Sequence, residues 1–281
     1  MLYYTPAMPQ WPIPTSRIFY AVGLIGIGVQ HFIFADFIWV IMPAPAPWLP
    51  GRPFLAYAVG AALIAAGIAI IFDLKGRTVA AITGAAFLLL IIVTHIPTQL
   101  MGTPGHIAVW NNAFKALTLC GGAWVVAGSW PEKSPGLPRF LESLMPFGKY
   151  FLAVTVITFG IEHFIYKQFV AMLVPTWIPG AVFWTYFAGI ALILSGASMI
   201  VNIQARLASF LLGLMIFLWF LVLHIPRAIA DPHTLMGNEW TSVFEALAFS
   251  GIAFLLAALP VPNRFAISYR KLSTAGAVGG R

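Results

Sequence analysis

The chain has 281 residues, of which 60% are hydrophobic and 8% are charged. Soluble domains carry about 25% charged residues, so this composition leaves too little polar surface for a water-soluble globule and predicts an integral membrane protein. The net charge of +7 does not indicate nucleic-acid binding, because the cations stand between apolar stretches, where they orient membrane proteins. The lipid bilayer is therefore the predicted partner, and no nucleic acid is expected.

Eight apolar stretches are long enough to cross a hydrocarbon layer, which takes about 20 residues. Proline, glycine or charged residues bound each stretch. The predicted spans, in chain order, are 17–42, 54–73, 78–98, 107–128, 149–174, 183–203, 206–226 and 240–260. The predicted fold class is all-α, a polytopic membrane protein with eight transmembrane helices. Pro97 and Pro226 fall at the ends of the third and seventh spans, where they are expected to terminate the helices.

The cations between these spans predict the orientation of the chain. Eleven Lys and Arg residues fall on the side that holds the N-terminus, and three fall on the opposite side. Cytoplasmic loops carry the excess of positive charge, so both termini of this multi-pass protein are predicted to be cytoplasmic. Lys115 is the remaining cation and lies inside the fourth span.

The sequence contains an internal repeat, so that its second half resembles its first half. A shift of 129 residues superimposes identical residues, among them Gly60 on Gly189, Gly67 on Gly196, Arg77 on Arg206 and His95-Ile96-Pro97 on His224-Ile225-Pro226. The first spans match at a shift of 132, with His31 on His163. The fourth spans match at a shift of 130, with Trp110 on Trp240 and Lys115 on Glu245.

Each half holds four spans, an even number, so both halves are expected to enter the membrane in the same sense, as parallel repeats. The predicted organisation is a first four-helix repeat at 1–129, a cytoplasmic linker at 130–148, a second four-helix repeat at 149–262 and a cytoplasmic tail at 263–281.

Two motif pairs carry a resemblance to a known family. HFIFADF at 31–37 is followed by PAPWLPG, and EHFIYKQF at 162–169 is followed by VPTWIPGAVFWTYFAG. These segments resemble the DoxX-like family of four-helix membrane proteins, over 17–128 and again over 149–260. The resemblance implies two fused DoxX-like units in a bacterial or archaeal cytoplasmic membrane. Some relatives are oxidoreductase subunits that pass electrons to quinone, so it also implies oxidoreductase partner subunits.

A polar layer is predicted in the outer half of the membrane. His31 and His163 each lie 14 residues after a predicted cytoplasmic cation, which corresponds to about 21 Å along a helix. His95 and His224 lie 18 residues after such a cation, or about 27 Å. Lys115 on the fourth span is expected to reach a similar depth, as is Glu245 on the eighth.

Ionisable residues at this depth are expected to face the protein interior and to have partners, because an unpaired charge there costs at least about 2.5 kcal/mol. Lys115, Glu162 and Glu245 are the candidate catalytic residues. The candidate substrate-binding residues are His31, His95, His163, His224, Trp110 and Trp240. Gln30 stands where the second half has Glu162, so the halves are chemically unequal, and we expect one specialised site.

Three functions remain open at this stage. The histidines could exchange protons with a quinone or another lipid-soluble substrate, since imidazole titrates near neutral pH. The same four histidines, His31, His95, His163 and His224, could instead ligate a haem or a metal ion. The third alternative is a non-catalytic transport or assembly subunit, in which polar residues hold the helices together. The first alternative, proton exchange with a quinone, predicts that the chain is an oxidoreductase subunit. The sequence does not decide between a quinone and a haem or metal as cofactor.

Overall fold

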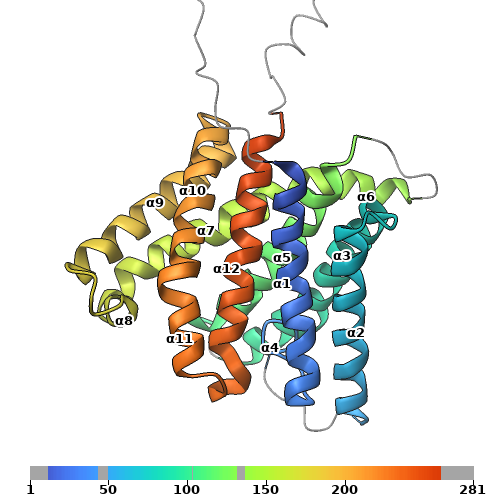
Figure 1. Cartoon of the computed structure of the whole chain (residues 1–281), viewed down its shortest axis with the longest axis horizontal. Helices are drawn as coiled ribbons and strands as arrows, with labels where there is room; N and C mark the ends of the chain where they lie inside the picture. The colour runs from blue at the N-terminus through green and yellow to red at the C-terminus, as the bar shows by residue number, and fades with distance from the viewer. Residues whose placement is uncertain (1–11, 44–49, 103, 132–136, 261–281) are drawn as a thin grey trace, which may run out of the picture.

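The computed structural model describes residues 12–43, 50–102, 104–131 and 137–260, and within these ranges the chain is helical and contains no strand (Figure 1). The predicted tail at 263–281 lies outside the described residues. The α-helices are α1 (Ile13–Phe34), α2 (Arg52–Ile71), α3 (Gly76–Leu90), α4 (Ile96–Met101), α5 (Asn111–Gly128), α6 (Arg139–Leu144), α7 (Gly148–Ile165), α8 (Lys167–Leu173), α9 (Ala181–Val201), α10 (Ala205–Trp219), α11 (Ile225–Ala230) and α12 (Thr234–Ala258). Two π-helical turns, η1 (Ile91–His95) and η4 (Phe220–His224), and two short 3₁₀ turns, η2 (Ile107–Trp110) and η3 (Met145–Phe147), complete the described elements.

Seven helical segments of the described chain are long and apolar enough to cross a membrane. They are Ile13–Phe34, Arg52–Ile71, Gly76–Met101, Arg139–Ile165, Ala181–Val201, Ala205–Ala230 and Thr234–Ala258. The all-α fold is thus confirmed for the described residues, with seven helical segments that could span a membrane. The predicted fourth span corresponds to α5, which is not among them because Asn111, Asn112 and Lys115 at its start lower its hydropathy.

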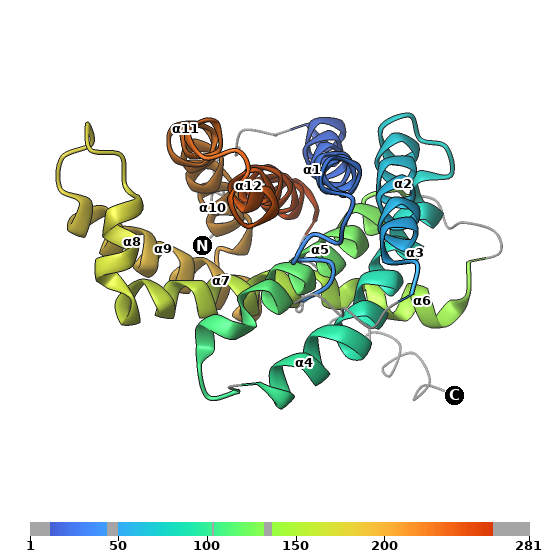
Figure 2. The same ribbon diagram turned by 90° about the horizontal axis from the view of Figure 1, so that it is seen from below.

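The centre of the molecule is formed by α5 and α12. These helices pack against each other, and most of their residues are buried. The first helix of each half packs against the fourth helix of the other half: α1 lies beside α12, and α7 lies beside α5 (Figure 2). The two halves are therefore interlocked along these four helices.

Small residues let the first two helices of each half approach closely. A Cβ atom added at Gly28 in α1 would lie 2.7 Å from the carbonyl oxygen of Gly60 in α2. A Cβ atom added at Gly160 in α7 would lie 2.7 Å from the carbonyl oxygen of Gly189 in α9. Both distances are shorter than a van der Waals contact, so only glycine fits, as is common where membrane helices cross closely.

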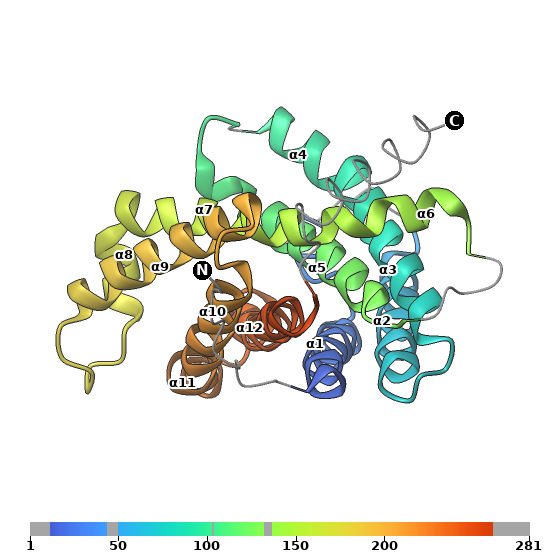
Figure 3. The ribbon, with the colours of Figure 1, turned by 90° about the horizontal axis from the view of Figure 1, so that it is seen from above.

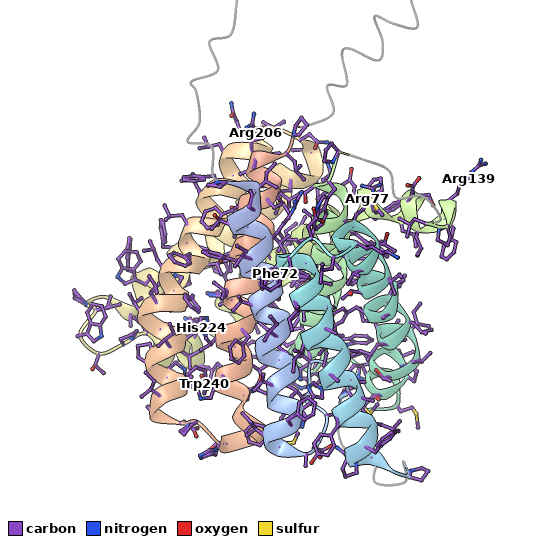
Figure 4. All side chains as sticks on the ribbon, turned by 45° about the vertical axis from the view of Figure 1, so that its right-hand side comes forward. Phe72, Arg77, Arg139, Arg206, His224 and Trp240 are labelled. Atoms are coloured by element: carbon purple, nitrogen blue, oxygen red, sulfur yellow. The ribbon has the colours of Figure 1, made fainter. Side chains whose placement is uncertain are left out.

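Arginine side chains cap the last turns of the two central helices at one end of the molecule. Arg77 donates to the carbonyl oxygen of Ala127 in α5 (3.0 Å), and Arg206 donates to that of Ala257 in α12 (2.8 Å). A cation at a helix C-terminus is favourable because the last carbonyl groups carry partial negative charge. Arg77 and Arg206 lie at the same end of the helices, whereas Trp240 lies toward the other (Figure 4).

The prediction that Pro97 and Pro226 terminate their helices is wrong. Helical structure continues to Met101 and to Ala230. Proline lacks an N–H group, and its ring would clash with the carbonyl group four residues earlier. A π-helical turn precedes each proline and resolves this conflict by widening the helix, so that the N–H group of Ile96 reaches the carbonyl oxygen five residues back. Each π-turn ends on a histidine.

The first span is also shorter than predicted. Helix α1 ends at Phe34, because Ala35 adopts a left-handed conformation with φ of 50°. The residues that follow fold into the protein: Phe37 is 3% exposed and Val40 is 1% exposed. The corresponding residues of the second half lie in and around α8, where Phe169 is 60% exposed. The two halves therefore differ in the segment that follows their first helix.

Candidate functional site

A cavity of about 280 Å³ lies in the second half of the chain. Its lining residues come mainly from α7, α8, α9, α10, η4 and α12, and α5 contributes Lys115. Figure 3 shows the arrangement of these helices. Four of the nine predicted site residues line this cavity: Lys115, His163, His224 and Glu245. The rest of the wall is mostly apolar, with aromatic side chains from α7, α9, α10 and α12.

A buried ion pair forms the polar side of the cavity. Lys115 Nζ lies 2.8 Å from Glu245 Oε2, and the side chains are 20% and 3% exposed, respectively. The other carboxylate oxygen, Glu245 Oε1, is buried and has no hydrogen-bond partner within the protein. An unpaired carboxylate oxygen is costly to bury. Because Glu245 lines the cavity, a bound molecule that donates a hydrogen bond would relieve this cost.

Two histidines add further hydrogen-bonding groups. His163 Nδ1 lies 2.7 Å from the carbonyl oxygen of Phe159, one turn earlier in α7. A carbonyl oxygen only accepts, so Nδ1 carries the proton, and Nε2 of a neutral ring is left as an acceptor. His224 reaches the cavity from the end of the π-turn η4. Such widened turns are frequent at functional sites.

Two tryptophans that the sequence analysis did not select form part of the apolar wall. The rings of Trp184 in α9 and Trp219 in α10 meet edge to face, with centroids 6.2 Å apart. At a shift of 129 residues, these positions correspond to Leu55 and Leu90. The sequence signal that could have identified these two residues is that each tryptophan of the second half replaces a leucine of the first half.

The predicted tryptophans Trp110 and Trp240 do not line this cavity. Trp110 Nε1 donates to the carbonyl oxygen of Pro104 (3.1 Å). The ring of Trp240 stacks on Phe244 in α12, with centroids 6.1 Å apart.

Glu162 lies beside the cavity rather than in its wall. It lines an adjacent hollow of about 440 Å³, which shares Lys115 and His163 with the cavity. The Glu162 side chain is hydrogen-bonded to Asn111 and lies within the electrostatic reach of Lys115. Its Oε1 atom is buried and has no partner in the protein. Lys115 thus stands between the carboxylates of Glu245 and Glu162.

The predicted residues His31 and His95 are separate from this site. His31 packs edge-on against Phe37, with ring centroids 6.1 Å apart, and His95 Nε2 lies 3.0 Å from the carbonyl oxygen of Val40. Both histidines are fully buried. The segment 37–41 therefore covers the two histidines of the first half, whereas its counterpart leaves His163 and His224 in contact with a cavity.

Gln30, the counterpart of Glu162, is fully engaged in the protein. Its Nε2 atom donates to the carbonyl oxygen of Gly237 (2.9 Å), and its Oε1 atom accepts from the hydroxyl group of Thr241 (3.1 Å). In the first half, Gln30 therefore joins α1 to α12. In the second half, the corresponding residue Glu162 has a buried oxygen, Oε1, without a hydrogen-bond partner.

The described residues contain no group of three or more His, Cys, Asp and Glu side chains that could hold a metal ion. The four histidines predicted as possible ligands, His31, His95, His163 and His224, divide between the two halves of the molecule and do not form one cluster. Haem or metal ligation stays a prediction from the sequence.

Comparisons with known proteins give no match: neither a protein-family model nor a curated protein nor a solved structure is similar to this chain.

Proposed function

We propose that the chain is a membrane subunit of a redox system and that the cavity of the second half binds a quinone or another flat, lipid-soluble molecule. The observation that carries this proposal is a mostly apolar cavity in which one buried carboxylate oxygen, Glu245 Oε1, has no partner. A hydroquinone hydroxyl group could donate to that oxygen. A quinone carbonyl group could accept from Lys115, whose ammonium group has three donors.

The chemistry of a quinone requires both protons and electrons. Reduction to the hydroquinone takes up two electrons and two protons. The ion pair of Lys115 and Glu245 and the imidazole groups of His163 and His224 lie where they could exchange protons with the ring oxygens. Glu162, on the far side of Lys115, would connect these groups to the adjacent hollow. The electrons would pass to or from a partner subunit.

A lipid-soluble molecule would enter from the bilayer, between α9 and α10. An apolar groove of about 780 Å³ runs along these two helices and shares Trp184, Met215 and Trp219 with the cavity. The two tryptophans thus stand between the groove and the cavity. We assign them the entrance and the aromatic contact with the ring of the substrate.

We further propose eight spans, with α5 as the fourth, arranged as two parallel DoxX-like repeats with both termini in the cytoplasm. Matching contacts in the two halves support the repeat. The glycine crossings of α1 with α2 and of α7 with α9 correspond, as do the capping arginines Arg77 and Arg206 and the two π-turns. Arg77, Arg139 and Arg206 lie at one end of the molecule, here called the arginine-rich end (Figure 4). The beginning of α1 and the end of α12 lie at this end (Figure 1), which is the end expected in the cytoplasm.

The proposed function is tested by quinone titration of the purified protein. Quinones quench tryptophan fluorescence at short range, so the wild-type protein is expected to show saturable quenching by a short-chain quinone. Trp184→Phe and Trp219→Phe are expected to lose part of this quenching. Trp240→Phe removes a tryptophan outside the cavity and is the matched control, with quenching unchanged.

A second variant tests the polar contact. Glu245→Gln removes the negative charge and replaces one carboxylate oxygen by an NH2 group, and it is expected to weaken quinone binding about tenfold, close to the effect of losing one hydrogen bond to a charged group. Absence of saturable quenching would contradict the proposal. An equal loss in the Trp240→Phe control would place the quinone elsewhere on the protein.

A further inference from the structure

A second cavity, of about 510 Å³, lies at the arginine-rich end, between the two halves of the chain. Its polar groups come from four elements: Arg77 from α3, Glu142 from α6, Lys149 from α7 and Ser209 from α10. Asn202, which precedes α10, also lines it. The proposed quinone site does not include any of these residues.

The charged groups of this cavity are unevenly matched. Lys149 Nζ donates to Asn202 Oδ1 (2.6 Å), a neutral acceptor, and lies 4.7 Å from the ring centroid of Tyr150. Arg77 Nη2 lies 3.6 Å from Glu142 Oε1, and Arg77 Nε is buried without a partner. Two cations thus face a single carboxylate, which leaves the cavity with an excess of positive charge.

The remaining wall is apolar and comes from the ends of membrane helices. Met199 belongs to the last turns of α9, Leu256 belongs to α12, Leu259 follows it, and Val125 belongs to α5. A ligand that fits both parts of the wall needs an anionic group beside Lys149 and Arg77 and hydrocarbon against these side chains. A free inorganic anion would leave the apolar part of the cavity unfilled.

We infer that this cavity binds the headgroup of an anionic phospholipid, with the first carbons of its acyl chains against the apolar wall. Basic pockets between membrane helices are a recurrent means of holding such headgroups, and hydrogen bonds from Lys and Arg to a phosphate group are charge-assisted. Helix α10 begins at Ala205, which also lines the cavity, and the N-terminus of a helix favours an anion. The inference does not depend on the proposed quinone site.

Lipid binding to the full-length protein tests the inference. Native mass spectrometry of the detergent-solubilised protein would compare phosphatidylglycerol, which is anionic, with phosphatidylcholine, which has no net charge. The wild-type protein is expected to retain phosphatidylglycerol preferentially. Lys149→Gln keeps a donor for Asn202 but removes the charge, and it is expected to weaken phosphatidylglycerol binding about fivefold, as one lysine near an anionic lipid surface contributes. Lys149→Arg is expected to retain binding.

The matched control is Lys75→Gln. Lys75 precedes α3, is exposed and does not line the cavity, so its loss removes the same charge without changing the site. Equal affinity for the two lipids would overturn the inference, as would an equal loss of binding in Lys75→Gln and Lys149→Gln. Displacement of the lipid by inorganic phosphate at comparable concentration would show a simple anion site and would also overturn it.

Discussion

The ion pair of Lys115 and Glu245 gives the most direct test of how the interior of the second half is held together. Lys115→Met would leave the Glu245 carboxylate, which is 3% exposed, without its partner at 2.8 Å. Removing one member of a buried pair costs about 3 to 5 kcal/mol, because the remaining charge is no longer compensated. We therefore expect Lys115→Met to lower the free energy of unfolding by about 3 kcal/mol or more.

The opposite variant is expected to cost less. Glu245→Gln leaves Lys115 charged, but the lysine side chain is 20% exposed and has Glu162 nearby. The expected loss is about 1.5 to 3 kcal/mol, the value of one hydrogen bond to a charged group. The double variant Lys115→Met/Glu245→Gln removes both charges of the pair, so its loss should be smaller than the sum by about 2 kcal/mol.

Unfolding in mixed micelles of increasing SDS content, followed by circular dichroism, would measure these differences. Lys75→Gln, at an exposed position, serves as a control and should stay within about 0.5 kcal/mol of the wild type. The reasoning is refuted if Lys115→Met is no more destabilising than Glu245→Gln, or if the double variant shows the simple sum of the two losses.

Two further predictions concern helix packing. Gly160→Ala places a Cβ atom 2.7 Å from the carbonyl oxygen of Gly189 and is expected to lower the free energy of unfolding by about 1 to 3 kcal/mol in the same assay; Gly128→Ala, where nothing lies within 4 Å, should cost nothing. Gln30→Leu removes the 2.9 Å donor to the carbonyl oxygen of Gly237, which keeps only the hydroxyl group of Thr241 at 3.4 Å, and is expected to cost about 1 to 3 kcal/mol; an unchanged stability would show that the hydrogen bond from Gln30 is not formed.

The sequence was sufficient to predict the helices and part of the site. Hydrophobic length identified the candidate spans, since the bilayer sets a minimum length for each. The cost of burying a charge led to the expectation that Lys115 and Glu245 have partners, and they pair with each other. The distances along the helices predicted that His163 and His224 both lie in the outer half of the membrane, and both line the same cavity.

The sequence could not show which half contains the cavity. Apart from Asp36, residues 35–42 are apolar, and no proline or glycine interrupts them before Pro43, so the sequence predicts that they continue the first helix. In the structure, Ala35 ends the helix and Phe37 packs on His31. A buried irregular segment and the end of a membrane helix have the same composition, so hydropathy alone does not separate them.

The packing of α1 against α12 and of α7 against α5 was likewise not predictable from the repeat. Four-helix units read from a sequence suggest two self-contained bundles, whereas here each central contact joins the two halves. Lys115 illustrates the consequence. It belongs to the first half, yet its ammonium group completes a cavity in the second half. Neither half would form this site alone.

The comparison of the two halves explains why equivalent histidines have unequal surroundings. In the first half, Val40 provides a carbonyl group for His95, and Gln30 has both of its polar atoms paired. In the second half, Phe169 is exposed instead of buried, and Glu162 has an unpaired oxygen. The same helical framework thus has its histidines covered by segment 37–41 on one side and in contact with a cavity on the other.

Buried polar atoms without a partner occur in both halves, among them His31 Nε2 and His95 Nδ1 in the first half and Glu162 Oε1 and Glu245 Oε1 in the second. Of these four, only Glu245 Oε1 belongs to a side chain that lines the cavity. Since an unsatisfied buried carboxylate oxygen is costly, its position in the wall of an open cavity is best explained by a ligand that pairs with it.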